Sequence, residues 1–174
     1  VGTSTLTIVW LVQPFLKTID WPLALYGPTW AILQFSISLF ALSAHKIEAR
    51  LGRKSSLLSF IVTSVLAYFL IGVVDSPWAG LFFFAIYFVR GVNGPILNDY
   101  INRCVESDIR ATVLSVKNLI GRLMFTILGP LVGLVSEHYS LSVAFLFCSC
   151  VFAFFGFLSI FFLNRNQILL GVDR

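Results

Sequence analysis

Apolar residues occur along this chain in five long blocks, and short polar breaks separate them. A block of about 18 or more apolar residues is long enough to cross a bilayer as an α-helix. The pattern predicts five membrane-spanning helices, at residues 21–44, 57–74, 77–101, 111–135 and 141–163. The breaks between them, such as "HKIEARLGRKSS", "DSPW" and "NRCVESDIR", carry the charges, proline and serine that are typical of helix ends.

The first stretch, "VGTSTLTIVWLVQPFL" at residues 1–16, is also apolar and helix-like. At 1.5 Å per residue it reaches about 24 Å, which is less than the hydrocarbon core of about 30 Å. We interpret it as the back part of a sixth helix. The pattern therefore predicts an all-α fold, a polytopic membrane helix bundle over residues 1–174 with five full transmembrane helices and one partial helix.

Composition supports a membrane location. Hydrophobic residues make up 58% of the chain, charged residues 11%, and the mean hydropathy is +0.92. Soluble domains are about 45–50% apolar and about 25% charged. We therefore expect the lipid bilayer to be the surroundings of this protein.

The charged residues of the breaks predict an orientation. Most lysines and arginines of the breaks fall on one side of an alternating topology, at Lys46, Arg50, Arg53, Lys54, Arg103, Arg110, Arg165 and Arg174. The other side carries Lys17 with Asp20, Asp75 and Glu137. By the positive-inside rule, the basic loops and the carboxyl terminus are predicted to be cytoplasmic, in a multi-pass protein of the cell inner membrane. Because the basic residues belong to short loops, a nucleic acid is not an expected partner.

One basic break contains a recognisable motif, in which Glu48, Arg50, Gly52, Arg53 and Lys54 join two predicted spans. It resembles the signature loop of the major facilitator superfamily, whose pattern is an acidic residue, Arg, any residue, Gly and two basic residues. Alanine stands here at the usual acidic position, and Glu48 lies one residue earlier.

A second stretch, "ESDIRATVLSVKNLIGRLMFTILGPLVG" at residues 106–133, is similar to the eleventh helix of bacterial members of that superfamily. The chain as a whole thus resembles the carboxyl-terminal half of such a transporter, from the end of helix seven through helix twelve. The resemblance implies a secondary active transporter that moves a small solute by alternating access, in many members with proton coupling. Its implied partner is an amino-terminal six-helix half, or a second copy through self-association.

The sequence leaves two other interpretations of the function open. Within the same class, the solute is a drug or lipophilic compound exported by proton antiport. In other classes, the chain is a membrane-embedded enzyme or a structural membrane fragment that transports nothing.

Polar residues inside the predicted spans are the candidates for a solute pathway. A charged side chain in lipid near mid-depth costs about 2.5 to 3.5 kcal/mol, so such a residue is expected to face water or polar partners. Residues three or four apart share a helix face. The candidates include two residues of the partial helix, Trp10 and Gln13. The others are Gln34, Tyr87, Arg90, Asn93, Asn98, Asn118 and Arg122. The two arginines are alternatively structural, paired with carboxylates or bonded to carbonyl groups. Gly129 and Gly133 fit a small-xxx-small motif of close helix contact.

Catalytic and cofactor motifs are missing from the sequence. It has no phosphate-binding glycine loop, no HExxH and no GxSxG. The two histidines, His45 and His138, fall at opposite ends of the predicted spans. We therefore expect no cofactor, no metal site and no enzymatic activity.

Overall fold

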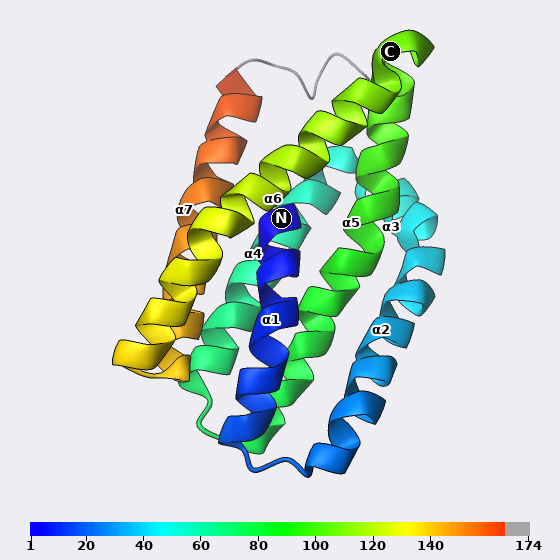
Figure 1. Ribbon diagram of the computed structural model, residues 1–174. Coiled ribbons are helices and arrows are strands. Elements are labelled where there is room, and N and C mark those ends of the chain that lie inside the picture. The colour runs from blue at the N-terminus through cyan, green and yellow to red at the C-terminus, as the bar shows by residue number, and fades with distance from the viewer. Residues whose placement is uncertain (166–174) are drawn as a thin grey trace.

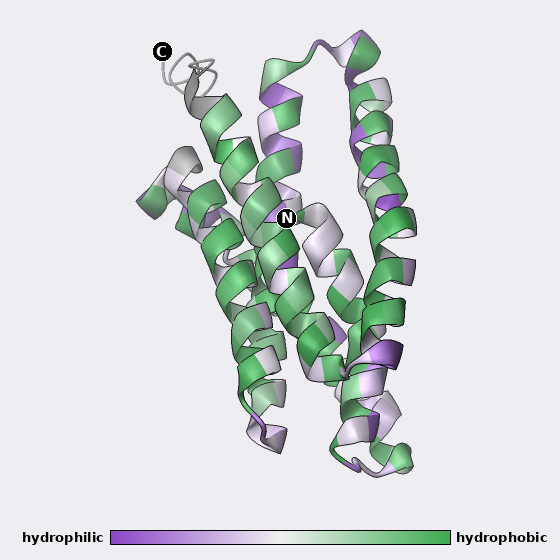
Figure 2. Cartoon of the chain, turned by 90° about the vertical axis from the view of Figure 1, so that its left-hand side faces the viewer, coloured by the Kyte–Doolittle hydropathy of each residue, from purple (hydrophilic) through white to green (hydrophobic). Residues whose placement is uncertain are grey.

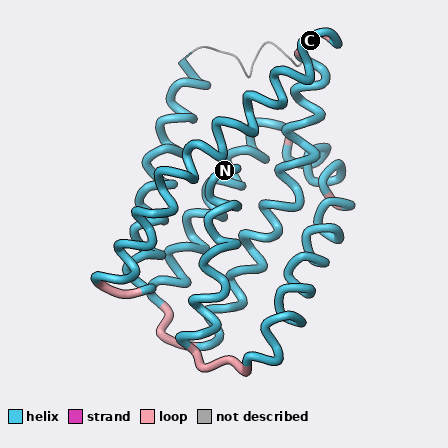
Figure 3. The backbone as a smooth tube through the Cα atoms, in the orientation of Figure 1, coloured by secondary structure: helices cyan, strands magenta, loops and turns pink. Residues whose placement is uncertain are grey.

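The computed structural model describes the backbone of residues 1–165, and the side chains of residues 1–52 and 55–162. Throughout these residues the chain is helical, with short connections and no strand (Figures 1 and 3). The helices in chain order are α1 (Gly2–Thr18), η1 (Leu23–Leu25), α2 (Tyr26–Leu42), α3 (Ala44–Leu51), α4 (Arg53–Val73), η2 (Pro77–Phe82), α5 (Phe83–Cys104), α6 (Ser107–His138) and α7 (Leu141–Arg165). The six long helices alternate in direction along the bundle (Figure 1).

Five helical segments in the described residues are long and apolar enough to cross a membrane, which confirms the predicted number of spans. They are Leu23–Leu42, Ser55–Val73, Pro77–Cys104, Ser107–His138 and Leu141–Phe162. Apolar residues predominate along these helices (Figure 2). Helices α5 and α6 extend beyond their predicted blocks: α6, which was predicted at 111–135, covers Ser107–His138, and α5 continues to Cys104 rather than to residue 101. Backbone hydrogen bonds continue a helix whether its side chains are apolar or polar, so hydropathy underestimates helix length.

The polar break at residues 45–56 was predicted as a connection, and that prediction is wrong because most of it is helical. Helix α3 continues almost directly from α2, and it ends at Gly52. The φ angle of Gly52 is 73°, in the left-handed region that a residue without a Cβ atom adopts at little cost. The chain turns at this glycine, and α4 begins at the next residue.

Because the long helices alternate in direction, their connections gather at the two ends of the bundle. Helix α3, the α5–α6 junction and the end of α7 lie toward one end, while η1, η2 and the α6–α7 junction lie toward the other (Figure 1). The basic residues of α3 and of the α5–α6 junction therefore gather at one end, as the charge pattern predicted. Which end faces the cytoplasm stays a prediction, and Arg174 lies outside the described residues.

Two helix pairs, α2 with α5 and α4 with α7, make the most extensive contacts in the bundle. Glycines sit at both contacts. A Cβ atom at Gly91 of α5 would lie 2.6 Å from the carbonyl oxygen of Ile37 in α2, and one at Gly72 of α4 would lie 2.9 Å from that of Ser142 in α7. Small residues of this kind let helix backbones approach closely in membranes.

The glycines that the sequence pointed to, Gly129 and Gly133, do not serve this purpose in the bundle. No heavy atom lies within 4 Å of a Cβ at Gly133, and the nearest atoms at Gly129 belong to Phe125 of the same helix. The prediction of a close helix contact there is wrong. The motif repeats small residues at the right spacing, but among the described residues no atom of another helix is within 4 Å of an added Cβ at Gly133 or among the nearest atoms at Gly129.

One face of helix α1 is buried in the core of the bundle. Ile8 and Val12 are fully buried, and Phe15 packs edge-to-face on Phe83 of α5 at a ring distance of 5.0 Å. Helix α1 contacts α5, α6 and α7. The core is thus built around the segment that hydropathy alone treats as too short to span.

Connections between the later helices are short. Only Val105 and Glu106 separate α5 from α6, and only Tyr139 and Ser140 separate α6 from α7. Each of these junctions begins by capping the preceding helix, with Val105 N–H donating to the Ile101 carbonyl at 3.0 Å. The connection from α1 to η1 is longer, at residues 19–22.

Candidate functional site

The predicted pathway residues lie on helices α1, α2, α5 and α6. Six of the nine are exposed: Trp10, Gln13, Gln34, Asn98, Asn118 and Arg122. Arg90 and Asn93 are half-buried, and Tyr87 is fully buried. In Figure 1, α1 and α6 lie in front of α4 and α7. Residues 57–74 and 141–163, which include most of α4 and α7, carry no charged side chain.

Arg90 of α5 is bonded to α1. Its Nη1 donates a hydrogen bond of 2.9 Å to the carbonyl oxygen of Thr5. Among the residues whose side chains are described, no carboxylate pairs with it. A guanidinium group has five N–H donors, so four of them are left without a protein partner in this part of the chain. The carbonyl bond matches one of the two alternatives raised for this arginine, and the remaining donors leave room for the other.

Tyr87 lies one helical turn before Arg90, on the same face of α5. It is 0% exposed, and its hydroxyl group has no hydrogen-bond partner among the described residues. A buried hydroxyl group is normally bonded. By contrast, the neighbouring buried tyrosine, Tyr68 of α4, donates a hydrogen bond of 2.6 Å to the carbonyl oxygen of Ser4. The tyrosine beside Arg90 therefore keeps a free polar group within the bundle.

Asn98 lies further along the same face of α5 and contacts α6. The ammonium group of Lys117 donates a hydrogen bond of 2.7 Å to its side-chain oxygen. Lys117 is half-buried. Lys117 was not among the predicted pathway residues, although it lies within the predicted span at 111–135, because helical spacing groups it with neither Asn118 nor Arg122. Its contact with α5 depends on how α6 crosses that helix, and the hydropathy pattern does not predict helix crossings.

Between Arg90 and Asn98, the face of α5 is uncovered at Gly94. A Cβ atom built there has no heavy atom within 4 Å. At 1.5 Å per residue, Arg90 and Asn98 are about 12 Å apart along the helix. We call Tyr87, Arg90, Gly94, Asn98 and Lys117 the α5–α6 basic site. It has two cationic groups, an uncovered backbone stretch between them and an unbonded hydroxyl group, a set of donors suited to an oxyanion.

The other candidates lie apart from this site. Trp10 of α1 stacks on Phe125 of α6 with a ring distance of 6.1 Å. It helps to line an open cleft of about 450 Å³ between α1 and α6, which also includes Pro14, Gly133 and Glu137. Among the described residues, no side-chain hydrogen bond or ion pair joins Gln13, Gln34, Asn118 or Arg122 to the α5–α6 basic site.

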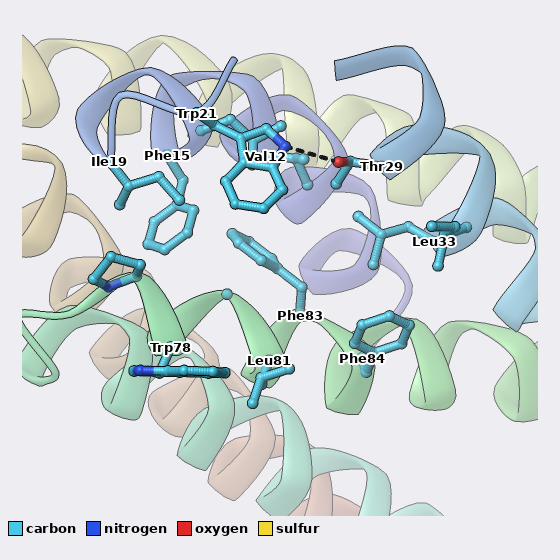
Figure 4. Close-up of a pocket in the computed structure, with 14 residues that line it drawn as sticks. Val12, Phe15, Ile19, Trp21, Thr29, Leu33, Trp78, Leu81, Phe83 and Phe84 are labelled. Carbon is cyan, nitrogen blue, oxygen red and sulfur yellow. Dashed lines mark hydrogen bonds between the residues drawn. The ribbon is translucent and has the colours of Figure 1, made fainter. Parts of the chain in front are cut away.

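A second cavity, of about 400 Å³, lies where α1, α2 and η2 meet (Figure 4). Aromatic and aliphatic side chains line it, among them Phe15, Phe83 and Trp78. Its polar contact is the hydrogen bond of 3.1 Å from the indole Nε1 of Trp21 to the hydroxyl oxygen of Thr29 (Figure 4). This lining has no charged group and so offers nothing to hold a charged solute.

The loop motif lies at the junction of α3 and α4. Gly52 N–H donates to the Glu48 carbonyl at 2.9 Å, and the side chain of Arg50 is exposed. The side chains of Arg53 and Lys54 lie outside the described residues. The backbone thus brings the motif to a turn between two helices at the basic end of the bundle.

Among the described residues, no group of three or more His, Cys, Asp or Glu side chains could hold a metal ion. The described residues form a helical bundle with five helices that are long and apolar enough to cross a membrane, and Arg90 and Lys117 lie on two of them, α5 and α6. No family model, no characterised protein and no solved structure matches this chain.

Proposed function

We propose that this chain forms the carboxyl-terminal half of a major-facilitator-type secondary transporter, which moves a small solute across the membrane by alternating access. The observation that carries the proposal is the division of the helices. Polar candidates lie on α1, α2, α5 and α6, mostly exposed, whereas the spans in α4 and α7 have no charge and pack on each other. In that superfamily the solute site lies near mid-membrane between two six-helix halves.

The energetic cost of the exposed polar groups supports a covering partner. An arginine at mid-depth in lipid costs about 2.5 to 3.5 kcal/mol on insertion scales. Arg122 is exposed near the middle of α6, a helix of 32 residues. Asn118 is exposed one turn away from it on the same helix. Water in a pathway, or a second half of the transporter, removes that cost.

The contact pattern supports the proposal independently. The units α1–α2–α4 and α5–α6–α7 have three long helices each, and corresponding helices run in opposite directions (Figure 1). Exchanging the units turns the α2–α5 contact into the α6–α1 contact, and it keeps the α1–α5 and α4–α7 contacts. The symmetry is partial, since the α5–α6 and α6–α7 contacts have no comparable counterparts in α1–α2 and α2–α4 among the described residues. Inverted repeats of three helices are nested within each half of major-facilitator transporters.

Labelling of introduced cysteines in the membrane tests this proposal without knowledge of the solute. In a cysteine-free background, Asn118→Cys should react with a membrane-impermeant, hydrophilic maleimide in inside-out or right-side-out vesicles. Leu66→Cys in α4 and Phe157→Cys in α7 are the controls, since these side chains are 53% and 71% exposed but are expected to face lipid. Equal reactivity at all three positions would contradict the division into a water-lined face and a lipid-facing pair.

Reconstitution tests whether the half needs a partner. Proteoliposomes that contain residues 1–174 alone should take up no solute, and the complete transporter should do so. Saturable, solute-specific uptake by the chain alone would mean that it works as a self-sufficient half-size transporter, through association of two copies.

A further inference from the structure

We infer that the transported solute is a small organic anion, and that its carboxylate or phosphate group binds at the α5–α6 basic site between Arg90 and Lys117. The inference rests on the proposed function and adds the chemical class of the solute. It rests on two cationic groups whose hydrogen-bond partners are neutral oxygens, and on a buried hydroxyl group that has no partner among the described residues.

Charge is the first support. Arg90 and Lys117 reach the site from neighbouring helices, and among the described residues neither pairs with a carboxylate. Their present partners are neutral oxygens, the carbonyl of Thr5 and the amide of Asn98. A hydrogen bond from a cation to an anionic oxygen is roughly twice as strong as one between neutral groups. An oxyanion therefore competes well for both donors.

Geometry is the second support. The guanidinium group of Arg90 has four N–H donors without a protein partner in the described part of the chain, and its planar fork fits the two oxygens of a carboxylate or phosphate. The Tyr87 hydroxyl group, one turn before Arg90, is buried and has no hydrogen-bond partner among the described residues.

Space is the third support. A Cβ atom at Gly94, which lies between Arg90 and Asn98 on α5, would meet no heavy atom within 4 Å. About 12 Å of helix separates Arg90 from Asn98, the residue that Lys117 contacts. A solute of a few carbon atoms with an acidic group at one end and a second acidic or polar group at the other fits this spacing.

Binding by the complete transporter in detergent tests the inference, with the thermal midpoint as readout. The probes are succinate and glycerol 3-phosphate, and their uncharged counterparts are succinamide and glycerol. We expect at least one of the anions to raise the midpoint with a saturable dependence on its concentration, and the uncharged compounds to leave it unchanged. Absence of a shift with both anions, or equal shifts with the uncharged compounds, would overturn the inference.

Single substitutions test whether the anion binds at the α5–α6 basic site. Arg90→Gln and Lys117→Gln should each weaken the apparent affinity for the anion by about tenfold or more, and Gly94→Leu should block the site while both charges stay. Arg103→Gln is the matched control, since Arg103 lies on the same helix but pairs with Asp99 at 2.8 Å. Anion binding that survives Arg90→Gln unchanged would assign the solute to another site.

The two proposals can fail separately. Cysteine labelling at residue 118 reports the water-lined face, and it does not depend on which solute binds. Normal labelling there with no anion binding would leave the transporter proposal standing and remove only the anionic class.

Discussion

Gly91 is the residue at which the packing of the bundle can be tested most directly. It is buried in α5, where α2 crosses. A methyl group at this position would lie 2.6 Å from the carbonyl oxygen of Ile37 and 2.9 Å from the Cβ atom of Phe40, both in α2. Carbon atoms at optimal contact are about 3.5–4.0 Å apart. The substitution Gly91→Ala therefore requires the two helices to separate by roughly 1 Å, by the same contact distances.

Two opposing terms set the expected size of the effect. Alanine is favoured over glycine inside a helix by about 0.5–1 kcal/mol. Extra atoms in a well-packed contact cost about 1–3 kcal/mol. Gly133→Ala is the matched control, since it gains the same helix term but meets no atom within 4 Å. The helix term cancels between the variants, so Gly91→Ala should be less stable than Gly133→Ala by about 1–3 kcal/mol.

The measurement is reversible unfolding of the purified chain in mixed micelles with increasing sodium dodecyl sulfate, followed by tryptophan fluorescence. The free energies of unfolding of the two variants are compared with that of the unsubstituted chain. If Gly91→Ala is as stable as Gly133→Ala, then α2 does not approach α5 at this glycine, and the packing described for this helix pair is incorrect.

Three further predictions follow from individual contacts. Tyr68→Phe removes a hydrogen bond of 2.6 Å and should lower the free energy of unfolding by about 0.5–1.5 kcal/mol, whereas Tyr87→Phe, which removes an unbonded hydroxyl group, should not lower it in the same micelle titration. Asp99→Asn breaks an exposed ion pair within one helix and should change stability by less than about 0.5 kcal/mol, and a loss above 2 kcal/mol would contradict its exposed setting. Cys104, exposed near the basic end, should stay unlabelled by an impermeant thiol reagent on intact cells when the other two cysteines are replaced, and labelling from outside would reverse the orientation.

Hydropathy predicted the number and order of the spans because lipid requires long apolar segments whatever their neighbours are. It placed the ends of α6 several residues too far inside, and it missed α3, since polar residues at the membrane boundary form helices as readily as they form loops. It also could not assign a role to α1. That helix has 17 residues, and the core forms around it.

The role of the candidate site stays a prediction. Helical spacing put Tyr87, Arg90 and Asn98 on one face of α5, and in the structure Arg90 bonds to α1 while Asn98 bonds to α6. Lys117 could not be predicted as a site residue, because its contact with Asn98 depends on where α6 crosses α5. The glycine contacts depend on helix crossing in the same way. Gly133 belongs to a small-xxx-small motif, yet an added Cβ there meets no described atom within 4 Å, whereas Gly91 belongs to no such motif and an added Cβ there would lie 2.6 Å from the carbonyl oxygen of Ile37.

The two-residue junctions of α5 with α6 and of α6 with α7 limit how the molecule can move. Each two-residue junction comprises three Cα–Cα steps, so it spans at most about 11 Å when fully extended. Sliding one of these helices past the next by a full turn, about 5.4 Å, would use about half of that length, and part of it is already used in turning the chain. The movement of α5, α6 and α7 relative to one another is therefore restricted. The longer connection at residues 19–22 allows α1 more movement relative to η1.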